Sequence, residues 1–109
     1  MENLFDIAEL IPYGADNAID RYDLLMAVRN VLGDISDREM RRMLEYSRQN
    51  GNIIINFQNG KGYFRPDCKE EIVKYIQQEE ARAKTIHFNL KSAKNALRVL
   101  EGQLTIDEI

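Results

Sequence analysis

A helix with a clearly marked start, followed directly by a β-hairpin, is the feature that most constrains how this chain can fold. Ser36 and Glu39 have the spacing of a capping box, in which the N-cap hydroxyl and the third-position carboxylate each accept a hydrogen bond from an otherwise unpaired backbone N–H. Ile35 and Met40 flank the cap as a hydrophobic staple. These signals predict a helix over residues 37–49.

The two sides of this helix differ in chemistry. At about 100° per residue, one side carries the residues suited to a core, namely Met40, Met43, Leu44 and Ser47. The other side presents Arg38, Arg41, Arg42, Glu45 and Gln49. A guanidinium offers a rigid two-pronged donor that suits phosphates and guanine edges, so this side is a candidate DNA-reading surface. An ordinary solvated helix face is the alternative.

The hairpin is the best-specified local structure in the chain. Residues 53–57 are rich in β-branched and aromatic side chains, Asn59-Gly60 suits a type I′ turn, and residues 63–65 return. A two-residue loop places Ile55 opposite Phe64, facing the core, and Asn56 opposite Tyr63. At the tip, Gly60 and Gly62 flank Lys61, where small residues let backbone amides approach a phosphate. We therefore expect DNA contacts from Lys61 and Tyr63.

Two further helices are predicted before this helix and hairpin. Asn3 can cap a short helix that carries Leu4, Ile7, Ala8 and Ile11 on one stripe and ends at Pro12, and residues 13–18 form a loop. Asp20, with Asp23 at the third position, caps the next helix, which Gly33 ends. Its expected buried stripe is Leu24, Leu25, Val28 and Leu32. Two capped helices joined by a tight turn predict a helix-turn-helix.

After Pro66, the spacing of Asp67 and Glu70 predicts a capping box at the start of a helix that runs to about Glu101, before Gly102. A heptad seam broken at Glu79 follows this helix, through Ile72, Ile76, Ala83, Ile86, Leu90, Ala93, Leu97, Leu100 and Leu104. Such a helix is longer than a small core can cover, so we expect self-association. The contact residues are Ile86, Leu90, Leu97 and Leu100. Packing of the whole helix on its own domain is the alternative.

Composition excludes several classes of protein. At 109 residues the chain can bury one modest core, and neither a membrane-spanning run nor a secretory signal is present, so we expect a cytoplasmic protein. Cys68 and His87 are the only residues of their kinds and do not make a zinc site. No nucleophile motif or phosphate-binding loop occurs. We therefore expect no catalysis, metal, cofactor or small-molecule ligand.

Charge is distributed unevenly. The net charge is −3, which is unfavourable for binding a polyanion. Residues 1–35 carry seven acidic residues against two arginines, but residues 36–66 carry six basic residues against three acidic ones. A basic reading segment on an acidic scaffold predicts local DNA binding that is weak for non-specific sites and sensitive to salt.

With these elements in place, the chain resembles the small winged helix-turn-helix proteins of bacteriophages and prophages of Gram-positive bacteria. The resemblance is carried, up to about Arg98, by the segments IPYGADNAIDRYDLL, ISDREMRRMLEYSRQNG and IIINFQNGKGYFRPDCKEEIVKYI. It implies a cytoplasmic DNA-binding protein in transcription or phage replication control, with the helix over residues 36–50 as the reader and the hairpin over residues 56–65 as the wing.

The sequence thus predicts a mainly α-helical protein with one small hairpin. The expected parts are a winged helix-turn-helix domain over residues 1–66, a long helix over residues 67–101 and a tail over residues 102–109. The expected partners are double-stranded DNA and a second copy of the chain, and not a membrane. A winged-helix module that binds another protein, without DNA, is the second hypothesis.

Overall fold

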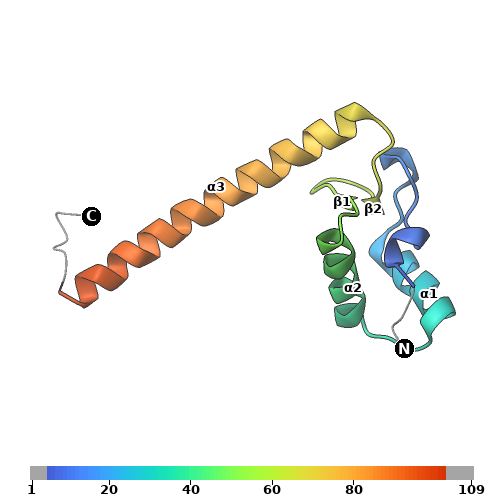
Figure 1. The fold of residues 1–109 in the computed structure, drawn as a ribbon, viewed down its shortest axis with the longest axis horizontal. Coiled ribbons are helices and arrows are strands. Elements are labelled where there is room, and N and C mark those ends of the chain that lie inside the picture. Colours follow the sequence, from blue (N-terminus) through green and yellow to red (C-terminus); the bar gives the residue numbers. More distant parts are fainter. Residues whose placement is uncertain (1–4, 103–109) are drawn as a thin grey trace. The chain divides into compact units, whose positions relative to one another are not determined.

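The structure, a computed structural model, describes residues 5–102 (Figure 1). Its elements are the 3-10 helices η1 (Ile7–Leu10) and η2 (Ala15–Asn17), the helices α1 (Arg21–Leu32) and α2 (Asp37–Gln49), the strands β1 (Ile55–Asn56) and β2 (Tyr63–Phe64), and the helix α3 (Lys69–Leu100). The prediction of a mainly helical chain with a small antiparallel hairpin and a long C-terminal helix is confirmed. Contacts divide the chain into one unit that ends at Tyr75 and a second that begins at Ile76.

The helix pair α1–α2 begins and ends where the sequence predicted. The Asp20 carboxylate accepts a hydrogen bond from the backbone N–H of Asp23 (2.8 Å), and Gly33 closes α1 with a φ of 90° that favours glycine. In the turn between the helices, Arg29 Nε donates to the carbonyl of Ile35 (3.0 Å). At Ser36 both hydrogen bonds of the capping box are present. Both helix starts are therefore determined by local side-chain chemistry.

The core of the first unit lies between α1, α2, η1 and the hairpin. Met40, Leu44 and Ser47 are buried on the predicted inner side of α2. On α1, Leu24 and Val28 are buried, but Leu32 is exposed, so its predicted place in the core is wrong. Leu32 is the last residue of α1, beyond the reach of the core. The core cluster consists of Ile7, Ala8, Ile11, Leu24, Val28, Met40, Leu44, Ile54 and Tyr63.

The N-terminal helix is shorter than predicted. Asn3 and Leu4 lie outside the described residues, and the first helix is a single 3-10 turn capped by Asp6. The Asp6 carboxylate accepts hydrogen bonds from the Ala8 N–H, the Ser47 hydroxyl and the Asn52 amide. Asp6 thereby joins η1 to the end of α2. The loop predicted over residues 13–18 contains the 3-10 turn η2.

The hairpin has the predicted register but a different turn. Ile55 pairs with Phe64, and Asn56 pairs with Tyr63. The backbone N–H of Gly60 donates to the carbonyl of Phe57 (2.9 Å), so the turn has residues 58 and 59 at its centre. No non-glycine residue among those described has a positive φ, as Asn59 would need in a type I′ turn, so that prediction is wrong.

Phe57, the first residue of the turn, packs against β2 and the start of α3. Its ring lies edge-on to Phe64 with centroids 5.4 Å apart, and the Lys74 ammonium lies 4.4 Å from its centroid. Phe57 belongs to a second small cluster with Ile55 and Phe64, against which Tyr75 packs. Phe57 therefore lies on the same face of the hairpin as Ile55, as strand alternation predicts, and the paired ladder ends at Asn56.

A third segment pairs with β2 on the side away from β1. Ile19 and Tyr63 exchange both backbone hydrogen bonds, at 2.9 and 2.8 Å. Gly62 allows this close approach, since its φ is 140° and a Cβ there would clash with the Ile19 carbonyl. The prediction that Gly62 opens the tip to a phosphate is therefore wrong, because its face is occupied by the protein's own backbone.

The start of α3 also differs from the prediction. The helix begins at Lys69, and the expected capping box of Asp67 and Glu70 is not formed. Instead, Glu71 accepts hydrogen bonds from the backbone N–H groups of Asp67 (3.0 Å) and Ala15 (2.8 Å). These bonds, the Ala15 one foremost, lower the pKa of Glu71. Glu71 therefore anchors the first turn of α3 to η2. The helix ends at Leu100, close to the predicted end.

Candidate nucleic-acid interface

The outer side of α2 is solvent-exposed along its length. Arg38, Arg42, Glu45 and Gln49 are all exposed, opposite the buried Met40. Among the described residues, the guanidinium groups of Arg38 and Arg42 make no hydrogen bond or salt bridge, although the charge of Arg42 helps to lower the pKa of Glu39. Their guanidinium groups are therefore available to an outside acceptor. This is the arrangement that the helical spacing predicted.

Arg41 differs from the other two arginines because it is already paired. Arg41 Nη2 lies 2.7 Å from Asp37 Oδ2, and Arg21 Nε from the start of α1 lies 3.5 Å from Asp37 Oδ1. Asp37 thus holds two arginines at the beginning of α2. The three side chains are partly exposed, so the pairs contribute little stability. Their effect is to place Arg21 beside α2, and a phosphate could exchange with Asp37 for either arginine.

Two other basic residues of the segment 36–66 serve the fold instead. Arg48 Nε donates to the carbonyl of Ile54 (3.0 Å), and Arg65 Nε donates to that of Ile11 (2.8 Å). The Arg65 guanidinium also lies 4.1 Å above the ring of Tyr13. The positive balance of this segment therefore overstates the charge available for a ligand. The exposed cations left for the surface are Arg38, Arg42 and Lys61, with Arg21 and Arg41 shared with Asp37.

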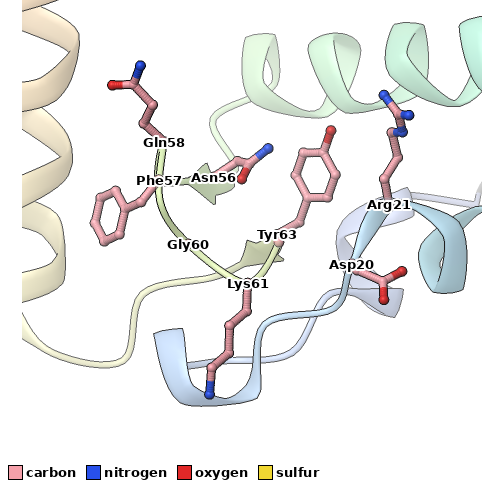
Figure 2. A pocket seen from close by; sticks show the side chains of 9 residues that line it. Asp20, Arg21, Asn56, Phe57, Gln58, Gly60, Lys61 and Tyr63 are labelled. Atoms are coloured by element: carbon pink, nitrogen blue, oxygen red, sulfur yellow. The ribbon is translucent and has the colours of Figure 1, made fainter.

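An open pocket of about 340 Å³ lies between the hairpin loop and the start of α1 (Figure 2). Its polar lining comes from Asp20, Arg21, Asn56, Gln58 and Lys61. In Figure 2, Arg21 and Tyr63 extend to one side while Lys61 extends to the other. The two cations therefore do not converge on one point, and the pocket does not form a single anion site.

Tyr63 is too deeply buried for the DNA contact that the sequence predicted. Its side chain is only 9% exposed and belongs to the core cluster, and its backbone is paired on both sides. The edge of its ring lines the pocket, but its main role is in packing. We therefore remove Tyr63 from the candidate interface and keep Lys61, which is exposed.

Sequence reasoning missed Arg21, Asn56 and Gln58. Arg21 reaches the interface because the Ile19 and Tyr63 backbones pair and because Asp37 attracts it. Neither contact has a local sequence signal, since the partners are far apart in the chain. Alternation along the first strand could have marked Asn56 as outward-facing, because Ile55 and Phe57 on either side are buried. Tyr46, exposed on the flank of α2, was also missed.

One group of side chains in the described part has metal-ligand types, but we assign it no metal. Asp67, Cys68 and Glu71 have ligand atoms within 4.8 Å of one another. Both carboxylate oxygens of Glu71 already accept backbone hydrogen bonds, and Cys68 is exposed. This group is explained by the anchoring of α3.

No helix among residues 5–102 is long and apolar enough to cross a membrane. Comparison of the chain with family models, with curated proteins and with solved structures gave no match. The case for a function therefore rests on the residues of the interface.

Proposed function

We propose that the first unit binds double-stranded DNA as a winged helix-turn-helix, with α2 in the major groove and the loop over residues 57–62 on the backbone. Three features support this proposal. The helices α1 and α2 are joined by a tight turn, a hairpin follows α2, and Ile19 pairs with the hairpin through an isolated β-bridge to Tyr63. This order provides a reading helix that is held on one side only.

The observation that carries the proposal is the contrast between the two sides of α2. Met40, Leu44 and Ser47 hold the inner side in the core, while the outer side presents Arg38 and Arg42, whose guanidinium groups form no salt bridge within the described residues. Arginine can bind the O6 and N7 atoms of guanine with two hydrogen bonds. Gln49 can bind adenine in the same manner, and Glu45 can accept a hydrogen bond from cytosine. A helix with these side chains can distinguish base pairs.

Contacts to the DNA backbone come from fewer groups. Lys61 on the loop and Arg21 beside α2 are the candidates, and both are exposed. Two phosphate contacts predict, for each bound unit, a salt slope of roughly −1.5 to −2 in a plot of log affinity against log salt. Asp37, Glu39 and Glu45 reduce the local positive potential, which favours binding to selected sites over binding to any duplex.

Selection from a randomised duplex library, followed by salt titration on the enriched duplex, tests the proposal. We expect one enriched motif and a slope in the range given above. Lys69→Ala serves as a control for loss of one positive charge, because Lys69 lies at the start of α3, outside α2 and the loop. A library that shows no enrichment and a duplex affinity that stays flat with salt would contradict the proposal.

The second hypothesis, a module that binds another protein without DNA, has one observation in its favour. Tyr22 on α1 and Tyr46 on α2 are 68% and 66% exposed. Tyrosine is enriched in protein interfaces, and binding through such side chains responds little to salt. Salt titration separates the two hypotheses, because DNA binding weakens steeply with salt and a protein interface of this kind does not. Tyr46→Ala leaves Arg38 and Arg42 in place. DNA affinity within about twofold of the parent is expected from the DNA proposal.

A further inference from the structure

In its described part, up to residue 102, the second unit is a helical stretch with an exposed apolar face. Ile86, Leu90, Leu97 and Leu100 of α3 are 53%, 51%, 54% and 85% exposed. They recur at alternating steps of four and three residues, with Ala83 and Ala93 in the same series. A strip with this spacing on a helix fits a second helix with the same spacing.

Acidic residues flank the strip toward its N-terminal end, where Arg82 and Lys84 stand beside Glu79 and Glu80 and where Glu79 is paired with Arg82. The C-terminal end carries Lys91, Lys94 and Arg98. Glu80 is therefore complementary to the basic end of an identical helix. This self-complementarity points to a second copy of the chain as the occupant, because a two-fold axis forms every favourable contact twice.

We propose that two copies of α3 pair antiparallel, with Ile86 of one copy against Leu90 of the other. In this register Ile76 meets Leu100, and Ala83 meets Ala93. Glu80 of one copy comes within reach of Lys94 and Arg98 of the other. The pairing does not depend on DNA binding, so either proposal can fail alone.

Parallel pairing in register is disfavoured by Glu79. It lies on the seam, where parallel pairing would place it directly against the same residue of the other copy. Parallel pairing would also place Glu80 beside Tyr75, and Lys94 beside Asn89, so neither charge would gain an opposite partner. In the antiparallel arrangement, Glu79 faces Leu97 near each end of the overlap. There its carboxylate can keep its contact with Arg82 (3.4 Å) and reach water.

Cys68 allows the orientation to be measured without engineering. It is exposed, it is the sole cysteine of the chain, and it directly precedes α3. From the rise of an α-helix, antiparallel pairing places the two Cys68 residues roughly 60 Å apart along the pair. Parallel pairing in register places them roughly 10–20 Å apart. Pulsed electron resonance on spin-labelled protein measures distances in this range.

A charge-reversal cycle tests the contact between Glu80 and Lys94. Glu80→Lys and Lys94→Glu should each weaken dimerisation by about threefold to tenfold at low salt, and the double variant should return to within about twofold of the parent. The two positions are about 21 Å apart on one helix, so they do not couple within a copy. Glu80→Lys with Lys91→Glu is the matched control, and no recovery is expected from it.

Sedimentation equilibrium gives the affinity for each variant, and Leu90→Glu with Leu97→Glu should abolish the dimer. A parent that is monomeric at about 100 μM overturns the pairing itself. A dimer with a short Cys68 distance, or a charge-reversal pair that does not recover, overturns the antiparallel orientation.

Discussion

Asp6 is the residue on which the N-terminal part of the first unit depends. Its carboxylate accepts hydrogen bonds from Ala8, Ser47 and Asn52, and so joins η1 to the end of α2. These bonds, the Ala8 backbone bond foremost, hold the pKa of Asp6 below its ordinary value. No local sequence pattern predicts this role of Asp6, because Ser47 and Asn52 lie more than forty positions away in the chain.

Asp6→Asn should destabilise the protein at neutral pH by about 2 kcal/mol, since an amide cannot accept all three bonds. A lowered pKa stabilises the fold above the unfolded value of about 3.9 and loses that contribution as pH falls through the lower folded value. The difference in stability between parent and variant should therefore shrink below about pH 4. Urea unfolding at pH 7 and pH 3 measures it. A difference that stays constant over this range would contradict the role of the carboxylate.

The structural role of Gly62 can also be tested with a single substitution. Gly62→Ala should destabilise the fold by about 2–4 kcal/mol, because the new Cβ would clash with the Ile19 carbonyl and the backbone is in a conformation that favours glycine. Gly51→Ala is a matched control, since Gly51 has a φ of 100° but no neighbour within 4 Å. Thermal unfolding of both variants tests this. Equal losses would mean that backbone strain alone, and not the contact with Ile19, explains the glycine.

At the scale of elements, the sequence predicted what local chemistry determines. The boundaries of α1 and α2 follow from caps at Asp20 and Ser36, and the hairpin register follows from alternation about Ile55 and Phe64. The predicted turn type was wrong, since the Gly60 N–H donates to the Phe57 carbonyl and residues 58 and 59 lie at the centre of the turn. The predicted start of α3 was wrong because Glu71 accepts a hydrogen bond from the backbone N–H of Ala15, which lies far away in the chain.

For the candidate site too, the sequence predicted what local spacing determines and missed what depends on distant partners. Helical spacing placed Arg38 and Arg42 outward on α2, as found. The pair of Arg41 with Asp37 is a four-residue step on one helix, so spacing could have indicated it. Spacing could not reveal that Arg65 binds the Ile11 carbonyl or that Tyr63 lies in the core, because both depend on which partners the fold brings close. Charge counted along the sequence therefore overestimated the basic surface.

The loop between β1 and β2 leads to a prediction about the wing. Lys61→Ala should weaken DNA binding uniformly across sequences and reduce the magnitude of the salt slope by about one, because a lysine on a phosphate contributes charge but no base recognition. Affinities measured at several salt concentrations for two different duplexes would test this. A changed order of preference between the duplexes would show that Lys61 reads bases.

At the scale of the whole molecule, the two proposals assign DNA binding to the first unit and pairing to the second. If α3 pairs as proposed, the Tyr75 residues at the ends of the two first units lie roughly 40 Å apart along the pair. Linking two readers makes the second DNA contact intramolecular, which compensates for the small number of cations on each unit. Leu90→Glu with Leu97→Glu should therefore weaken binding to the selected duplex by at least about tenfold while leaving the fold of the first unit intact. Anisotropy and circular dichroism together measure this, and unchanged affinity in a monomeric variant would contradict the linkage.

The most direct test of the central claim is fluorescence anisotropy of the selected duplex with the parent protein and with Arg38→Ala and Arg42→Ala, alone and combined. Each bidentate base contact contributes about 1–3 kcal/mol, so each single variant should bind roughly tenfold to a hundredfold more weakly. The double variant should lose its preference for the selected site over a scrambled duplex. Ser36 and Glu39, which start the helix, are unchanged in all three variants, so their folds should match the parent. A folded double variant that binds the selected duplex as tightly as the parent would contradict the claim that α2 reads DNA.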